Sequence, residues 1–190
     1  GDRTSGACPS HNRRSMRWRS IVAGAVALAL AGGTAVVGWK THAEAERLVT
    51  NPIETRRLPV QTPIDFGMVY DDLAISSADG LQLVGWYVPS RNGAIIVAQH
   101  GYRSTRAEML NEAAMLHAHG YGVLVPALRA HDLSDGTLIT FGAREVDDLL
   151  RWIEHARRLS GVDPDRIGLL GNSLGGTIAI EAAARTPAVQ

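Results

Sequence analysis

Three short apolar runs, each followed by a stretch with helical periodicity, most constrain how residues 66–190 can fold. Such runs suit strands that are buried on both faces of a sheet. Strands that alternate with helices form parallel sheets through right-handed crossovers. We expect strands at 94–98, 122–125 and 167–171, and helices at 106–119, 146–159 and 173–185.

An antiparallel hairpin is expected ahead of these units. Asp79-Gly80 stands between two runs of β-forming residues, 69–75 and 81–88. Asp-Gly favours a tight hairpin turn, because the central residues of such turns need positive φ angles. The predicted fold class is therefore α/β: an antiparallel hairpin followed by parallel βαβ units, with helices covering the sheet.

An uncharged run from Ile21 to Trp39 precedes the expected domain. A helix needs roughly 20 such residues to cross the hydrocarbon core of a membrane. Arg13, Arg14, Arg17 and Arg19 precede the run closely and only Lys40 follows it closely. This bias predicts a cytoplasmic N-terminus and an extracytoplasmic domain. We expect a basic leader (1–20), a transmembrane signal anchor (21–39), a polar linker with three prolines (40–65) and a partial hydrolase-like domain (66–190).

Two alternatives to the anchor remain for this run. A secretory signal peptide, cleaved near Ala43-Glu44-Ala45, would release the domain, although its apolar stretch is usually about 7–15 residues long. The length of the run favours the anchor. A buried helix of a soluble domain is the third interpretation, and it is disfavoured because the run is apolar on every side.

Composition excludes several other classes of protein. The net charge is zero and the basic residues form no long stripe, which argues against nucleic-acid binding. Cys8 is the only cysteine, so no intrachain disulfide can form. The sequence has neither zinc-ligand spacing nor a phosphate-binding glycine loop, and no metal or cofactor is expected. The chain does not begin with methionine, and Met16 is a possible true start.

The segment between the third strand and the last helix contains the strongest motif. It reads Gly171-Asn172-Ser173-Leu174-Gly175-Gly176 and matches G-x-S-x-G between a strand and a helix. A sharp turn there would lift the serine hydroxyl to the carboxyl edge of the sheet, with small residues at 171, 175 and 176 allowing close backbone contact. Ser173 is the candidate nucleophile. A serine that merely caps the helix is the plainer alternative.

A second motif, Gln99-His100-Gly101-Tyr102-Arg103, follows the first buried strand. An oxyanion hole needs two N–H donors about 3 Å from the developing negative charge. We expect these donors to be the backbone N–H groups of Leu174 and Tyr102. His100 is expected to order the loop rather than to catalyse, and a simple turn after the strand is the plainer reading of His100-Gly101.

These motifs resemble those of the α/β-hydrolase superfamily, in particular its prolyl-oligopeptidase-like and serine-aminopeptidase-like branches. The resemblance spans about residues 69–190 and implies a serine hydrolase fold with no cofactor. Four segments carry it: His100-Gly101, 129–136, 163–167 and 171–176.

The middle loop departs from the pattern of the superfamily. Ala127 and Asp132 stand where such proteins often have Asp and Gly, which puts the conformation of the loop in doubt. Arg129 is expected to pair with a carboxylate such as Asp148 or, almost equally, to be solvated. Tyr102 and Phe141 are compatible with an apolar pocket or with ordinary packing.

The catalytic base and acid are not identified in this sequence. The resemblance implies the order Ser, acid, His, yet Glu181 is the only carboxylate after Ser173 and no histidine follows it. Glu181 is expected to be a solvated helix residue, and His131 is a remote candidate for the base. We expect the acid and histidine to lie beyond residue 190, so that residues 1–190 alone would be inactive.

Two functions follow from the sequence. One is acyl transfer from a small-molecule or peptide ester, thioester or amide through Ser173. The other is a non-catalytic, membrane-tethered binding domain of the same fold, because fold does not fix function.

Overall fold

The computed structural model describes residues 11–189, which fall into two units, Gly1–Arg47 and Leu48–Gln190. Cys8 and the start of the basic leader lie outside the described residues.

The first unit consists of helix α1, His11–Val49, whose last two residues belong to the second unit. Its side chains from Ile21 to Trp39 are exposed on all sides of the helix. By length and composition the helix can cross a membrane, and a signal sequence has the same properties. The helix runs ten residues further than Trp39, because nothing interrupts it before Pro52, which disfavours helical geometry at Asn51.

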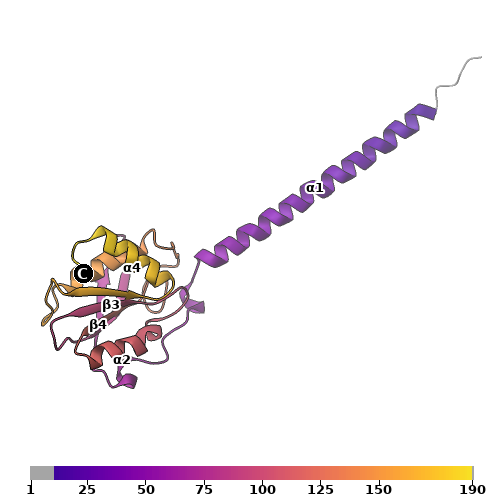
Figure 1. Ribbon diagram of the computed structural model, residues 1–190. Coiled ribbons are helices and arrows are strands. Elements are labelled where there is room, and N and C mark those ends of the chain that lie inside the picture. Colours follow the sequence, from indigo (N-terminus) through magenta and orange to yellow (C-terminus); the bar gives the residue numbers. More distant parts are fainter. Residues whose placement is uncertain (1–10, 190) are drawn as a thin grey trace, which may run out of the picture. The chain divides into compact units, whose positions relative to one another are not determined.

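The second unit contains a five-stranded sheet in the order β1-β2-β4-β3-β5 (Figure 1). β1 pairs with β2 and β2 with β4 in antiparallel fashion, whereas β3 is parallel to both β4 and β5. The expected hairpin and parallel units are thus confirmed. The strands are β1 (Asp71–Ser76), β2 (Gln82–Val88), β3 (Ile95–Gln99), β4 (Gly122–Pro126) and β5 (Ile167–Gly171).

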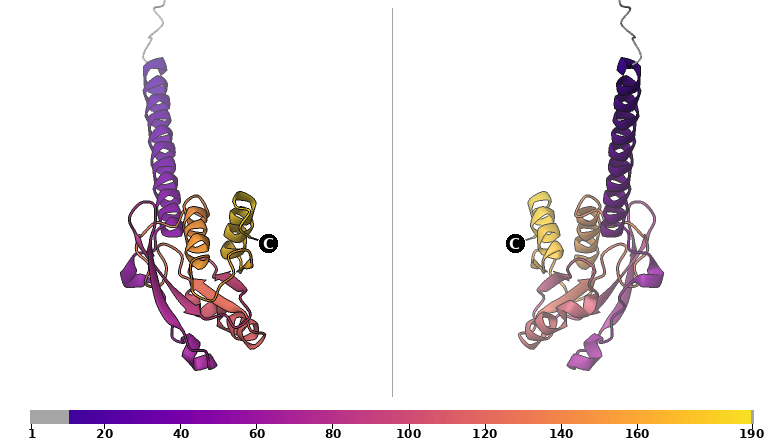
Figure 2. Two further views of the ribbon diagram at one scale, coloured as in Figure 1. Left: turned by 90° about the vertical axis from the view of Figure 1, so that its left-hand side faces the viewer. Right: turned by 90° about the vertical axis from the view of Figure 1, so that its right-hand side faces the viewer.

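Helices cover both faces of this sheet, with α2 (Leu110–Ala118) on one face and α3 (Glu145–Ala156) and α4 (Leu174–Arg185) on the other (Figures 1 and 2). The side chains of β2, β3, β4 and β5 alternate between two apolar clusters, so that Leu124 packs with α3 and α4 while Val123 and Val125 pack with α2. A Cβ at Gly85 would lie 3.0 Å from the Trp152 ring, so the bare backbone of β2 makes room for that ring.

The expected helix 106–119 differs in its first turn. Residues Arg106–Met109 form a 3₁₀ turn before α2 begins. The Arg106 side chain turns away to a buried carboxylate, Asp132, with Nε–Oδ2 and Nη2–Oδ1 distances of 2.9 and 3.1 Å. Its guanidinium also lies 4.1 Å from the centroid of the Trp86 ring. This anchor explains how Asp132 occupies its left-handed conformation (φ 51°), where the superfamily often has glycine.

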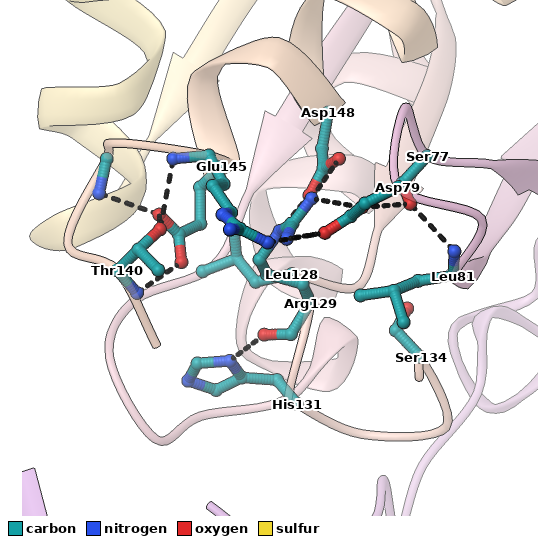
Figure 3. Close-up of polar contacts among 12 residues, drawn as sticks. Ser77, Asp79, Leu81, Leu128, Arg129, His131, Ser134, Thr140, Glu145 and Asp148 are labelled. Atoms are coloured by element: carbon teal, nitrogen blue, oxygen red, sulfur yellow. Dashed lines mark hydrogen bonds and ion pairs between the residues drawn. The ribbon is translucent and has the colours of Figure 1, made fainter. Parts of the chain in front are cut away.

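A second buried arginine fixes the loop between β4 and α3 (Figure 3). Arg129 donates to Asp148 through Nε at 2.6 Å and Nη2 at 2.8 Å, which confirms the expected pair. The same guanidinium bonds both carboxylate oxygens of Asp79, in the turn of the β1–β2 hairpin. These bonds from Arg129 lower the pKa of Asp79 and so keep its carboxylate charged. The guanidinium of Arg129 therefore joins the β1–β2 hairpin, the loop between β4 and α3, and helix α3.

We expect Arg129→Ala to destabilise the fold much more than Arg144→Ala. Removing Arg129 leaves the buried Asp148 carboxylate unpaired, which costs about 3–5 kcal/mol of the free energy of unfolding. Arg144 also bonds Asp79, at 2.7 Å, but its side chain is 58% exposed, and such a pair contributes about 0–1 kcal/mol. Urea unfolding of the full-length protein measures both, and equal losses would contradict the assignment.

Candidate active site

The carboxyl ends of the parallel strands β3, β4 and β5 meet at one edge of the sheet. Gln99, the last residue of β3, joins all three ends. Its side-chain Nε2 donates to the carbonyl of Pro126 at 3.1 Å, and its own carbonyl accepts the N–H of Asn172 at 3.0 Å. The loops that follow these strands, 100–105, 127–142 and 172–173, are thereby brought together.

Ser173 forms the bend between β5 and α4. Its backbone has φ 51° and ψ −117°, a conformation that L-residues adopt only when the surroundings impose it. The residue is exposed, and its hydroxyl caps no N–H of α4. Ser173 thus holds the N-cap position of α4 without a side-chain capping bond, and its hydroxyl stands at the N-terminal, positive end of the helix dipole.

Two glycines of this bend, Gly171 and Gly175, are required by close backbone contacts. A Cβ at Gly175 would lie 2.3 Å from the carbonyl oxygen of Gln99, and one at Gly171 would lie 2.4 Å from the carbonyl carbon of Gly175. Both distances are far below van der Waals contact, so any side chain would push α4 away from β3 and β5. At Gly176 the nearest atom, the oxygen of Gly171, is 3.1 Å away.

The loop after β3 lies against this bend, since a Cβ at Gly101 would be 3.4 Å from the Cβ of Ser173. Side chains accept hydrogen bonds from two of its amides: the N–H of Gly101 donates to Glu108 Oε2 at 2.6 Å, and that of Arg103 to His131 Nε2 at 2.9 Å. Among the described residues, the N–H of Tyr102 between them has no acceptor, and neither has the N–H of Leu174.

Two buried histidines, His100 and His131, bind these loops together, and both imidazole rings are neutral. His100 Nε2 accepts the N–H of Leu128 at 3.1 Å, so its Nδ1 carries the proton and donates to the carbonyl of Gly101. His131 follows the same pattern, with Nδ1 donating to the carbonyl of Arg129. Burial, assisted by the neighbouring His131, lowers the pKa of His100 to about 3, and burial likewise lowers the pKa of His131.

The remote candidacy of His131 as a base is thereby contradicted. Both of its ring nitrogens are engaged, and its side chain is completely buried. The His100 ring bonds the carbonyl of Gly101 and the N–H of Leu128, and so contacts the loops after β3 and β4. Glu181 lies on α4 and pairs with Arg185 one turn along, as a helix-surface residue does.

An aromatic pair borders the loop after β3. The rings of Tyr102 and Phe141 stack with centroids 5.4 Å apart and an interplanar angle of 25°. The Phe141 side chain is 49% exposed. Its backbone is in the left-handed region, with φ 52°. The buried Glu145 carboxylate imposes this turn by accepting the N–H groups of Thr140 and Gly142 and the hydroxyl of Thr140 (Figure 3).

The structure thus gathers His100, Gly101 and Tyr102 beside the bend of residues 171–176. Sequence reasoning missed Glu108, Glu145 and the bracing part of His131. For Glu145 alone the sequence holds a local signal, a carboxylate that closely follows a threonine and a glycine, Thr140 and Gly142. Within residues 11–189, no group of three His, Cys, Asp or Glu side chains is arranged to hold a metal ion.

Comparison with known proteins places the chain. Residues 79–190, more than half of it, match the family described as X-Pro dipeptidyl-peptidase (S15 family). The chain belongs to this family. Its partial domain has the α/β-hydrolase fold, as the sequence motifs implied.

Three similar proteins illustrate the relationship of this S15-family chain. The Pyrococcus furiosus esterase Pf2001 is 30% identical with a TM-score of 0.67, over 75% of this chain and 53% of the esterase. The uncharacterized protein Rv2307c of Mycobacterium tuberculosis is 29% identical over 90% of this chain and 59% of its own length. The thiohydrolase aneE of Aspergillus aculeatus is 30% identical over 60% of this chain and 37% of its own. The chain spans about half the length of such relatives.

We expect Gly175→Ala to disrupt the bend, because the added methyl group would collide with the fixed backbone of Gln99 and His100. A clash of this kind costs about 1–3 kcal/mol or more. Gly176→Ala should cost less than about 1 kcal/mol, since alanine is the better helix former and its neighbour can give way slightly. Thermal melting of the two full-length variants compares them, and a Gly176→Ala loss as large as that of Gly175→Ala would refute the argument.

Proposed function

We propose that the full-length protein is a serine hydrolase that cleaves an ester, thioester or amide through an acyl-enzyme on Ser173. The observation that carries the proposal is the strained, exposed bend at Ser173 with the loop of Gly101 against it. Two backbone N–H groups there, those of Leu174 and Tyr102, have no acceptor among the described residues. A serine in a strained turn next to free donors is the arrangement that acyl transfer needs.

The chemistry follows from these groups. The hydroxyl of Ser173 attacks the substrate carbonyl after losing its proton to a base, and the carbonyl oxygen becomes negatively charged. The N–H groups of Tyr102 and Leu174 donate to that oxygen, and the N-terminus of α4 adds its positive dipole. Collapse of the tetrahedral species expels the leaving group, and water then hydrolyses the acyl-serine.

The base and its orienting acid are proposed to come from outside residues 1–190. Among the described residues, His100 and His131 lie nearest the loop after β3, and the ring nitrogens of both are occupied. No histidine follows Ser173 in the sequence. Val189 already forms a parallel bridge with Ile167 on the open side of β5, where a further strand of the sheet would continue.

The substrate is proposed to be a small molecule or peptide with an acyl group. The names of an esterase, a thiohydrolase and a peptidase family among the similar proteins are compatible with ester, thioester and amide bonds. The exposed Phe141, stacked on Tyr102, offers an apolar surface beside the proposed oxyanion donor. Residues 21–39 are proposed to anchor the protein with its domain outside the cytoplasm, and signal cleavage would instead give a secreted enzyme.

Fluorophosphonate labelling of the full-length protein tests the nucleophile. We expect covalent labelling of the wild type, its loss in Ser173→Ala, and unchanged labelling in Ser160→Ala, because Ser160 is an exposed loop residue. Mass spectrometry of the labelled peptide locates the modified residue. An unlabelled wild type, tested beside a reactive serine hydrolase, would refute the proposal and favour the binding-domain alternative.

A matched pair at Glu108 tests the oxyanion loop. Glu108→Ala removes the acceptor of the Gly101 N–H and should loosen the neighbouring donor at Tyr102. Because loss of a whole donor costs about 10²–10³ in kcat, we expect a loss of about tenfold for this looser loop. Glu108→Gln keeps an oxygen acceptor and should stay within about threefold of wild type. Steady-state hydrolysis of p-nitrophenyl acetate compares them, and equal rates for both variants would contradict this use of Tyr102.

A further inference from the structure

The segment Leu48–Arg56, which we call the strap, is hydrogen-bonded to both loops of the proposed site. It bridges the loop between β4 and α3, where Thr50 pairs with Leu138 in antiparallel fashion. Flanking bonds extend the bridge: the N–H of Ile139 donates to the carbonyl of Val49 at 2.7 Å, and that of Asn51 to Thr137 at 2.8 Å. The strap therefore pairs with that loop as a short antiparallel segment.

Side chains lock the strap in place. Asn51 is 4% exposed, and its Nδ2 donates to the carbonyl of Ala130 at 2.7 Å, in the same loop as the bracing His131. Arg56 returns to the strap through a bond from Nε to the carbonyl of Asn51 and reaches the carbonyls of Ser134 and Gly136. The buried amide of Asn51 and the guanidinium of Arg56 thus link the strap to residues about eighty positions later in the chain.

The strap also receives the side chains of the loop after β3. The hydroxyl of Tyr102 donates to the carbonyl of Leu48 at 2.7 Å, and Nη2 of Arg103 donates to the carbonyl of Thr50 at 2.8 Å. Arg103 Nε bonds the same Tyr102 hydroxyl at 2.8 Å. Leu48 and Val49 end α1, where the last carbonyls of a helix lack intrahelical donors, so the loop satisfies groups that would otherwise stay unpaired.

We propose that the strap is a positioning element of the oxyanion hole, with Asn51 as its positioning residue. The inference rests on the proposed function, since Tyr102 is there the oxyanion donor. Tyr102 is held through its neighbours' amides by Glu108 and His131, and through its own hydroxyl by the strap. Arg103 is also held at a strained φ of 52°, and without its bond to the strap the loop would relax and turn the Tyr102 N–H away.

Asn51→Ala and Tyr102→Phe in the full-length protein test this inference, with Arg57→Ala as the control because Arg57 is an exposed residue directly after the strap. Hydrogen exchange followed by mass spectrometry should show exchange of residues 101–104 about tenfold faster in both variants than in the control. This readout does not depend on catalysis. It therefore separates the inference from the proposed function, which fails if wild-type Ser173 is not labelled.

The kinetic readout distinguishes positioning from mere stability. We express kcat per site titrated with the fluorophosphonate. Both variants should lose about tenfold in kcat, while KM changes less than about twofold. They should lose about as much affinity for a trifluoromethyl ketone, because its adduct with the serine carries the oxyanion. Unchanged exchange of 101–104 would overturn the inference. So would a lower melting temperature with unchanged kcat per titrated site. If one variant fails to fold, the other decides the test.

Discussion

The approach of the first turn of α4 to the end of β3 is the contact on which the rest of the proposed site depends. A hydrogen atom is all that fits at Gly175, because the carbonyl oxygen of Gln99 would lie 2.3 Å from a Cβ. This closeness makes β5 bend sharply into α4 and places Ser173 beside Gly101. The proposed nucleophile and the proposed oxyanion loop are neighbours because two pieces of backbone touch without side chains between them.

Polar groups that are buried and fully paired then fix the loops around this contact. Two neutral histidines and two arginine–carboxylate pairs each join segments that the sheet alone would leave separate, and the carboxylate of Glu145 fixes the turn of residues 140–142. Burying such groups is costly unless each finds its partners, so they favour one arrangement of the loops over many. The strained residues Arg103, Asp132 and Phe141 lie within this network, which supplies the contacts that hold them there.

The sequence was informative where the relevant signal is local. Strand β5 was predicted to the residue, β3 and β4 to within one residue, and the bend at Ser173 from its glycines. The start of α2 and the end of α1 were misjudged. In the first case a distant carboxylate, Asp132, draws Arg106 away, and in the second no helix-breaking residue precedes Pro52. Within the expected linker over 40–65, residues 40–49 continue α1 and residues 48–56 are hydrogen-bonded to the second unit.

By itself, the sequence determined the α/β class, the order of strands and helices, and the position of the candidate nucleophile. Apolar periodicity and glycine spacing act over a few residues, and those few residues are enough to decide them. Only the tertiary structure decided that Glu108 and His131 leave the Tyr102 N–H free, and that Asn51 fastens the strap to the loop of Ala130. Partners so far apart in the chain meet only once the whole sheet has formed, because no local pattern records which distant carbonyl a buried donor will find.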